Sequence, residues 1–289
     1  MRLVTLASRP GWHTDELARA ARALGHEHHL CRYEALVGSL GGRPGLRSGT
    51  VALDGADVVL ARIIPDGSLE QVIFRVDALH RLQERGVRVV NSARAIERSV
   101  DKFWTSSLLE QAGLPTPDTV VTESFDEAMA AYRQFGDVIL KPLFGSMGLG
   151  LVRLSDEDTA WRVLRAVERI RGVFYLQRVV PHPGRDVRAF VVGGRVLAAI
   201  ARSAEGWRTN VSRGGHATPV TLSPADAALA VRAAAAVEAE YAGVDLLPGN
   251  DGTTWVLEVN GIPGWEGLQR ATAVDVAGAI VAMATGAAP

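Results

Sequence analysis

The sequence predicts an α/β protein whose C-terminal part changes to α+β. Residues 1–90 alternate short apolar runs with stretches of helical periodicity, as in a parallel sheet covered by helices. Beyond Phe174 the pattern turns more antiparallel, and Gly193-Gly194 between two apolar runs is a hairpin signal. The length of 289 residues is near two domains, at roughly 150 residues each, and is enough to bury a substantial core.

The first predicted domain, residues 1–95, alternates strands and helices. Each helix has a capping residue near its start and a glycine at its end, Thr14 and Gly25 for the first helix and Ser68 and Gly86 for the second. The strands are expected at 3–7, 57–61 and 87–90, and a loop rich in Gly, Arg and Pro at 38–49.

Residues 96–176 are predicted to form a second unit with a glycine-rich loop between two strands. Ser99 is expected to cap a helix that ends at Gly113, and Ser124 with Glu127 forms a capping box for the next helix, which ends at Gly136. The flanking strands are expected at 138–141 and 151–154, the loop at 144–150, and a further helix at 155–170.

Residues 177–289 are predicted to form a third unit of strands and two helices. An alanine-rich helix should begin near Ser223 and end by Gly243, because Ser, Pro and Asp are typical of a helix start. The strands are expected at 187–192, 195–200, 244–247 and 254–259, and the last helix at 273–284.

The composition excludes several classes of protein. A formal net charge of −1 argues against a chain that wraps nucleic acid, since such chains carry a clustered basic surplus. The single cysteine, Cys31, cannot form an internal disulfide, which excludes a stapled scaffold. The first residues do not resemble a signal peptide, and the apolar tail 271–289 is short of the ~20 residues that span a bilayer. We therefore expect a cytoplasmic protein without nucleic-acid or membrane partners.

The basic residues are unevenly divided between the two types. Only Lys102 and Lys141 are lysines, so the other 29 of the 31 basic residues are arginines. A codon bias explains the excess of arginine, and chance could have left two lysines. Arginine does not replace lysine where a compact ammonium must meet a phosphate in a tight space, so these two positions are candidates for such a role.

The segment from Lys141 to Gly150 suits a flap over phosphates. A strand ends at the lysine, and three glycines within six residues, Gly145, Gly148 and Gly150, allow backbone amides to approach a ligand closely. A plain glycine hairpin is the alternative interpretation. A dinucleotide-binding motif fits poorly because a strand, not a helix, follows the glycines, and no Gly-Lys-Ser/Thr sequence of a P-loop occurs.

Three oxygen-bearing residues lie on or just beyond two neighbouring predicted strands. Glu258 and Asn260 are two residues apart, so they point to the same side of an extended segment, and Asp245 lies on the strand before them. Two carboxylates and an amide oxygen form a hard ligand set suited to Mg²⁺ shared with nucleotide phosphates. Acids at strand ends also commonly just face water, which is the alternative.

The predicted hairpin region is rich in arginine, whose planar fork binds carboxylate or phosphate oxygens through two hydrogen bonds. Most of the 29 arginines are expected to be solvated surface charges. Two other groups are less informative. His26 to His29 contains a glutamate and three histidines but reads as a polar loop, and Cys31 as a small buried residue. The candidates in the hairpin region are Arg185, Asp186, Arg188, Arg202, Arg208, Asn210 and Arg213.

Taken in order, these pieces resemble the ATP-grasp family, in the branch of ribosomal-protein glutamate ligases and tetrahydromethanopterin glutamate ligases. The resemblance runs from about Ser99 to the C-terminus, preceded by a Rossmann-like strand–helix domain. It rests on the following motifs: Ser99-Val100-Asp101-Lys102, Ala112 to Pro117, Leu140-Lys141-Pro142 with Gly145 to Gly150, Gln177 with Arg185 to Arg188, Asn210 with Arg213-Gly214-Gly215, Gly243-Val244-Asp245, and Leu257 to Gly267.

The resemblance implies a role for each candidate residue. Lys102 and Lys141 would bind ATP phosphates under a flap that includes Gly145, Ser146 and Gly148, and Asp245, Glu258 and Asn260 would hold Mg²⁺, or Mn²⁺ in its place. Gln177, Arg178, Val179 and Val180 would contact adenine, largely through the backbone. Relatives commonly carry an acid where this chain has Arg178, so a side-chain contact there is in doubt. Further roles are implied as follows: Asp186 near the ribose and Arg208 beside the nucleotide, Arg202 and Asn210 at the transferring phosphate, and Arg188 and Arg213 at the substrate carboxylate.

The activity implied is the ligation of a carboxylate and an amine. The carboxylate attacks the γ-phosphate of ATP to give an acylphosphate and ADP, and the amine then displaces phosphate to form an amide. The loop sequence looks closest to the pterin-cofactor branch, which implies addition of glutamate to a tetrahydromethanopterin-like acceptor. Addition to a protein C-terminus, a kinase that phosphorylates a hydroxyl, and a nucleotide-binding module without turnover stay open. Relatives are often dimers or tetramers, so a homodimer or homotetramer is expected by analogy.

Overall fold

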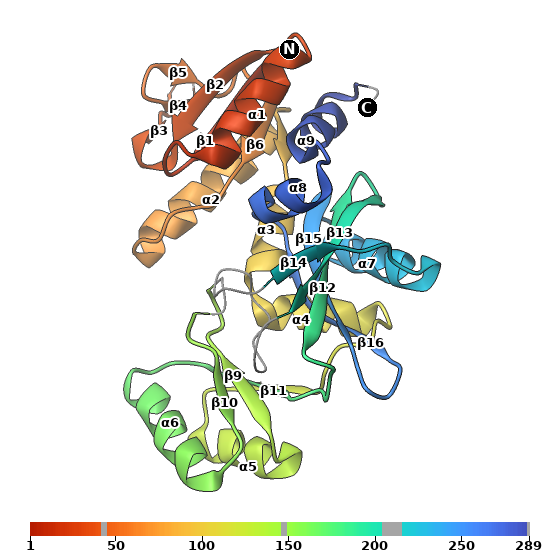
Figure 1. The fold of residues 1–289 in the computed structure, drawn as a ribbon. Coiled ribbons are helices and arrows are strands. Elements are labelled where there is room, and N and C mark those ends of the chain that lie inside the picture. Colours follow the sequence, from red (N-terminus) through yellow and green to blue (C-terminus); the bar gives the residue numbers. More distant parts are fainter. Residues whose placement is uncertain (42–44, 146–148, 204–215, 288–289) are drawn as a thin grey trace.

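The computed structural model describes residues 1–41, 45–145, 149–203 and 216–287. Helices and strands are combined in three units that follow one another in space (Figure 1). The N-terminal unit and the C-terminal helix lie together at one end, a five-stranded sheet lies in the middle, and a smaller sheet with two helices lies at the other end. The mixed fold predicted from the sequence is confirmed.

The N-terminal unit is built on a parallel sheet in the order β2-β1-β6-β7. Strands β1, β6 and β7 are rich in Val, Leu or Ala, and the side chains of β6 are buried on both faces, as expected for a covered parallel sheet. Helix α2 begins at the predicted cap, Ser68, which accepts from the amide of Gln71 in a capping box. The unit comprises β1 (Arg2–Ala7), α1 (Trp12–Ala23), β2 (Glu27–Arg32), η1 (Tyr33–Ala35), β6 (Val58–Ala61), α2 (Leu69–Glu84), β7 (Arg88–Val90) and α3 (Ala93–Val100).

Several sequence predictions for this region were wrong. The residues from Glu27 onward form strand β2 rather than a polar loop, because each of them pairs with a residue of β1. Helix α1 begins at Trp12, where Thr14 bonds back to Gly11, rather than at Thr14. The loop predicted at 38–49 includes parts of a small antiparallel sheet made of β3 (Leu36–Gly38), β4 (Leu46–Ser48) and β5 (Val51–Ala52).

The middle unit is a four-stranded antiparallel sheet in the order β10-β9-β11-β8, with α5 and α6 on one face. Leu140, Leu176 and Phe174 point into this helical layer, so the alternate residues of the same strands face the other way. The strands on either side of the glycine-rich loop lie where they were predicted. The elements are α4 (Lys102–Gln111), which leads into the unit, β8 (Thr119–Thr122), α5 (Phe125–Phe135), β9 (Val138–Lys141), β10 (Val152–Leu154), α6 (Glu157–Arg169) and β11 (Phe174–Arg178).

Helix α4 begins later than predicted. Asp101, not Ser99, caps it, since the Asp101 carboxylate accepts from the amides of Phe103 and Trp104. Ser99 instead lies in the last turn of α3, where its hydroxyl donates to the Ile96 carbonyl. The break between the two helices therefore falls directly before Lys102.

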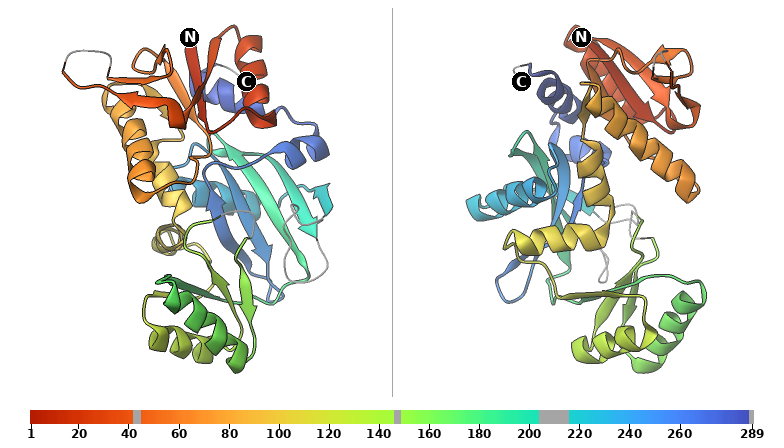
Figure 2. Two further views of the ribbon diagram at one scale, coloured as in Figure 1. Left: turned by 90° about the vertical axis from the view of Figure 1, so that its left-hand side faces the viewer. Right: turned by 180° about the vertical axis from the view of Figure 1, so that it is seen from behind.

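The C-terminal unit is a five-stranded antiparallel sheet in the order β14-β13-β12-β15-β16. One face of this sheet packs on α7 and α4 through residues such as Ala189, Val244 and Val256. The apolar part of its other face packs on the N-terminal unit and the last two helices (Figure 2). The elements are β12 (Arg185–Val192), β13 (Arg195–Ser203), β14 (His216–Pro219), α7 (Pro224–Ala236), β15 (Tyr241–Pro248), β16 (Thr254–Asn260), α8 (Glu266–Thr272) and α9 (Val276–Thr285).

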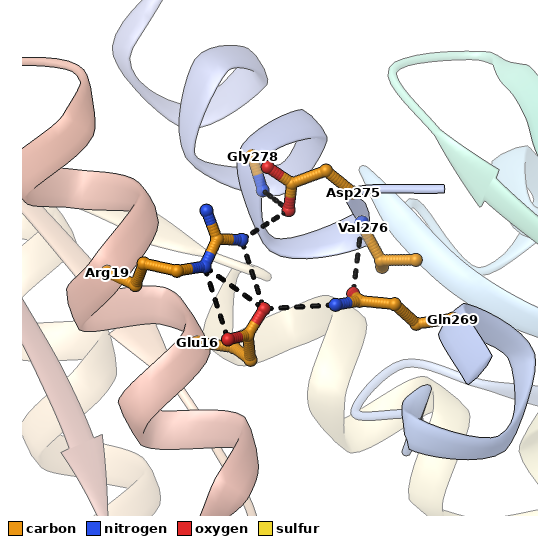
Figure 3. Close-up of polar contacts among 6 residues, drawn as sticks. All are labelled: Glu16, Arg19, Gln269, Asp275, Val276 and Gly278. Atoms are coloured by element: carbon orange, nitrogen blue, oxygen red, sulfur yellow. Dashed lines mark hydrogen bonds and ion pairs between the residues drawn. The ribbon is translucent and has the colours of Figure 1, made fainter. Parts of the chain in front are cut away.

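The two ends of the chain are joined by a polar cluster between α1 and the α8–α9 segment (Figure 3). Arg19 donates to Glu16 at 3.0 Å and to Asp275 at 2.6 Å, and Gln269 donates to Glu16 at 3.0 Å. Asp275 also caps α9 by accepting from the amide of Gly278. A shallow cavity of about 420 Å³ opens at this cluster. Since these side chains bond to one another, we interpret the cluster as a structural clip.

Within the part of the chain that the structure describes, no helix is long and apolar enough to cross a membrane.

Candidate active site

One face of the five-stranded sheet carries most of the residues that the sequence singles out. Arg188 of β12 lies opposite Asp245 of β15, and Asp245 lies opposite Glu258 of β16. Asp186 is two residues before Arg188, hence on the same face, and lies opposite Arg202 of β13. We call these residues, together with Asn260, the charged face: Asp186, Arg188, Arg202, Asp245, Glu258 and Asn260.

A β-bulge in β16 gives Glu258 its direction. The pairing shifts so that Asp245 faces Glu258 whereas Leu246 faces Val256, which makes Leu257 the extra residue. In a regular strand Val256 and Glu258 would point the same way. With the bulge, Val256 is fully buried against α7 while Glu258 lies on the charged face, the kind of re-aiming for which bulges are found beside active sites.

The charged face is held by a buried network of ion pairs. Arg188 binds Asp245 with both arms of its guanidinium, at 2.6 and 2.7 Å. Arg202 binds Asp186 in the same way, at 2.7 and 2.6 Å, and reaches Asp245 at 3.0 Å. Burial alone would raise the pKa of Asp245, but Arg188 and Arg202 outweigh it and lower this pKa to about 2. Asp245 is therefore ionised at neutral pH.

The predicted metal ligands form a set that fits a hard divalent cation. Glu258 is half-buried and makes no hydrogen bond or ion pair with another described residue, so its oxygens are available to a cation. Asp245 keeps lone pairs beyond those that the two arginines use. The Asn260 side-chain oxygen accepts from the amide of Ile262 and has a second lone pair. Within the described ranges no cluster of three His, Cys, Asp or Glu offers a competing metal site.

Lys141, on the middle sheet, belongs electrostatically to the same site. Its ammonium donates to the side-chain oxygen of Gln177 at 2.6 Å. Burial lowers the pKa of Lys141 to about 8, against the opposing effect of the carboxylate of Glu258. The charge of Lys102 lowers it further and that of Asp245 raises it. Lys141 thus experiences the fields of two predicted metal ligands and of the other lysine.

Lys102 connects helix α4 to the start of the glycine-rich loop. Its ammonium donates to the carbonyl of Gly145 at 2.9 Å and to that of Leu143 at 3.4 Å. Burial lowers its pKa, and the nearby carboxylate of Glu258 opposes this shift. Gly145 has φ of 144°, a conformation that glycine adopts without strain.

The segment from Gln177 to Val180 follows strand β11. The amides of Arg178 and Val179 donate to the carbonyls of Asp118 and Asp137. The amide of Val180 has no hydrogen-bond partner among the described residues. The Arg178 guanidinium pairs with Asp118 at 2.8 Å and lies 5.9 Å from the ring of Trp255. Arg178 therefore takes part in an ion pair at the surface.

The sequence did not point to two buried residues of the N-terminal unit that support the charged face. Asn91, directly after β7, donates to the carbonyls of Tyr241 and Gly261 at 2.7 and 2.6 Å. Arg62, directly after β6, donates to the carbonyl of Pro263 at 3.0 Å and lies over the ring of Trp265. Both hold the turn that follows Asn260. Their position at the carboxyl ends of predicted parallel strands was the available signal.

Five predicted site residues lie outside the described residues: Ser146, Gly148, Arg208, Asn210 and Arg213. Their assignments stay predictions. The remaining candidates gather on the charged face, on β9 and β11, and at the start of α4. This arrangement places two ammonium groups against a set of carboxylates suited to a divalent cation, which is a chemistry suited to binding a polyphosphate.

Comparison with known proteins identifies the family of the chain. A family model described as the RimK-like ATP-grasp domain matches residues 99–284. The chain belongs to the RimK-like ATP-grasp family. It is thus an ATP-grasp ligase, of the class that forms carbon–nitrogen bonds.

Curated relatives cover most of this ATP-grasp chain. It is 35% identical over 260 residues to the tetrahydromethanopterin:alpha-L-glutamate ligase of Methanosarcina acetivorans, with 80% of each chain covered. It is 36% identical over 274 residues to a probable alpha-L-glutamate ligase of Thioalkalivibrio sulfidiphilus, covering 93% of this chain and 89% of the relative.

A solved structure supports the same fold. The ATP-grasp ligase PsnB, in complex with its precursor peptide PsnA2 and AMPPNP, superposes with a TM-score of 0.74 at 25% identity. The match covers 98% of this chain and 97% of PsnB.

Proposed function

We propose that this ATP-grasp ligase uses ATP and Mg²⁺ to add L-glutamate to a tetrahydromethanopterin-like cofactor or precursor. The observation that carries the proposal is that Asp245 and Glu258 lie opposite each other on one face of the sheet and that both carboxylates act on the ammonium of Lys141. A nucleotide phosphate chain with its cation needs ammonium groups and carboxylates around it. The relative from Methanosarcina acetivorans supports the choice of glutamate and of the acceptor.

In this proposal each group on the charged face has a task. Asp245, Glu258 and Asn260 would hold Mg²⁺, or Mn²⁺ in its place, and the ion would neutralise charge on the phosphates. Lys102 and Lys141 supply positive charge from the opposite side of the site. Arg202 keeps Asp245 oriented, and one of its terminal nitrogens makes no bond to another described residue, so it can face a phosphate.

The ligation is a transfer of a phosphoryl group followed by acyl transfer. A carboxylate oxygen attacks the γ-phosphorus of ATP and ADP leaves. The amine nitrogen then attacks the acyl carbon, phosphate leaves and the nitrogen loses a proton. Phosphoryl transfer depends on positioning and on charge neutralisation more than on covalent catalysis, and the two lysines with a cation held by the carboxylates would supply much of that neutralisation.

A peptide acceptor is the second candidate. PsnB, whose fold this chain shares, was solved with a precursor peptide. Addition of glutamate to a protein C-terminus would use the same phosphate and metal groups.

The test is to incubate the purified chain with ATP, Mg²⁺, glutamate and either a tetrahydromethanopterin-like acceptor or a peptide, and to weigh the products. A gain of one glutamyl unit on the pterin supports the proposal, and a gain on the peptide alone replaces the acceptor. A phosphate gain indicates a kinase, and unchanged acceptors contradict ligation. Lys141→Met and Glu258→Ala should each abolish product while leaving the melting temperature within a few degrees. Normal turnover in either variant would refute the site.

A further inference from the structure

We propose that the side chain of Gln177 is a positioning residue that holds the ammonium of Lys141 toward the nucleotide phosphates, and that Thr119, Tyr175 and Ser106 hold Gln177 in turn. The inference rests on the proposed function only in taking Lys141 as a phosphate ligand. It assigns to the Gln177 side chain a task distinct from the adenine contact expected of its backbone.

The hydrogen bonds that link Lys141 through Gln177 and Tyr175 to Ser106 are called the relay below. The sheet register brings the strand residues of this relay to one face. Tyr175 of β11 lies opposite Lys141 of β9, and Gln177 lies opposite Ile139 of β9 and Thr119 of β8. Alternate residues of a strand share a face, so Lys141, Tyr175, Gln177 and Thr119 all point away from α5 and α6. Gln177 and Lys141 are diagonal neighbours, which puts their polar ends within hydrogen-bond distance, at 2.6 Å.

The direction of the Gln177 amide is set by its other partners. Its nitrogen donates to the hydroxyl of Thr119 at 3.1 Å and to that of Tyr175 at 3.4 Å. The Tyr175 hydroxyl is bonded in turn to that of Ser106, on α4, at 2.7 Å. Gln177 is 3% exposed, so turning the amide over would bury its NH₂ group against the ammonium of Lys141, two donors facing each other. The amide oxygen is therefore fixed toward Lys141.

A neutral partner leaves the charge of Lys141 available. An ammonium has three donors, and the bond to Gln177 uses one of them. A carboxylate at the same distance would orient the ammonium equally well but would cancel its charge. The chain therefore has an amide where orientation without neutralisation is required.

The isosteric variant Gln177→Glu tests the proposal. Dissociation constants for ATP and for adenosine are measured by calorimetry on the whole chain. We expect the parent to bind ATP more tightly than adenosine. Gln177→Glu should weaken ATP binding by about tenfold or more, because the new carboxylate cancels the charge of Lys141 and with it a charge-assisted contact to phosphate. The dissociation constant of adenosine, which lacks phosphates, should change by less than about twofold. Gln111→Glu, which makes the same change of charge at an exposed site on α4, should leave both constants unchanged.

Tyr175→Phe provides a second variant that adds no charge. It removes the hydroxyl that orients Gln177. It should weaken the binding of ATP by a smaller factor than Gln177→Glu does, again without changing the binding of adenosine. Equal losses for ATP and adenosine would assign Gln177 to adenine and overturn the proposal, as would an unchanged ATP constant in folded Gln177→Glu. Equal binding of ATP and adenosine by the parent would overturn both the role of Lys141 and the proposal for Gln177. Intact preference for ATP without any ligation product would instead refute only the proposed function.

Discussion

Lys102 and Lys141 differ from the arginines of the charged face in the partners they have. Arg188 and Arg202 are bound to the carboxylates of Asp245 and Asp186, which cancel their charge. Lys141 is bound to an amide oxygen and Lys102 to two backbone carbonyls, which are neutral. Among the described residues of the site, the positive charge that remains for an anionic ligand is therefore mainly on the two lysines. The rarity of lysine in the sequence pointed to these positions, and their environment gives the physical reason.

Lys141→Arg should lower the ligation activity, although 29 of the 31 basic residues of the chain are arginines. The planar guanidinium is larger and cannot use the single Gln177 oxygen as the compact ammonium does. We expect kcat/KM for ligation to fall about 100-fold, as misplacement by about 1 Å at an active site can cause. Steady-state kinetics of parent and variant measure this. A variant with parental kcat/KM would show that the position tolerates any cation.

The pH dependence of ATP binding should show the titration of Lys141. Below its pKa of about 8 the side chain is a cation and attracts phosphate, and above it the side chain is neutral, so affinity is lost as pH rises through 8. The charged groups that act on it are Glu258, Lys102 and Asp245. A lysine with its ordinary pKa would lose affinity only at higher pH. ATP dissociation constants from about pH 6.5 to about pH 9.5 measure the effect. The same loss in Lys141→Met would contradict the assignment.

At the scale of secondary structure, the register of the sheets explains why some features could be predicted and others could not. The strands around the glycine-rich loop and the hairpin at Gly193-Gly194 follow from neighbouring residues, and they were predicted correctly. The pairing of Arg188 with Asp245 joins residues 57 positions apart and depends on the order β12-β15, which no local pattern contains. The same holds for the relay from Lys141 to Ser106.

The buried ion pair between β12 and β13 should contribute much more to stability than a matched pair at the surface. Asp186→Asn leaves Arg202 buried with one partner fewer, and breaking a buried pair costs about 3 kcal/mol or more. Asp137→Asn breaks a similar two-armed pair with Arg153, but those side chains are 34% and 38% exposed, so the cost should be under about 1 kcal/mol. Urea denaturation measures both. Equal costs would show that the network does not depend on burial.

At the scale of the whole molecule, the first and last parts of the chain share one core. Leu3 and Leu17 of the N-terminal unit pack in the same cluster as Phe190 of the five-stranded sheet and Ile280 of α9. Helices α1 and α9 accordingly lie side by side (Figures 1 and 2). The sequence predicted strand–helix alternation at one end and a helix at the other, but nothing local in either segment indicates that they meet. This cluster therefore contains residues from both sides of the boundary predicted at residue 95, and the boundary itself stays a prediction.

Because of this shared core, a cavity made in α9 should weaken the N-terminal unit and the five-stranded sheet together. Ile280 is 1% exposed, and Ile280→Ala should lower the free energy of unfolding by about 3 kcal/mol. Ile170→Ala, at a position that is 79% exposed, is the matched control and should change it by less than about 0.5 kcal/mol. Urea denaturation is followed by tryptophan fluorescence and by circular dichroism, and two of the six tryptophans, Trp12 and Trp265, lie in the shared region. Both probes should shift together in Ile280→Ala. Transitions that no longer coincide would show that the two units unfold separately, and the shared core would then not couple them.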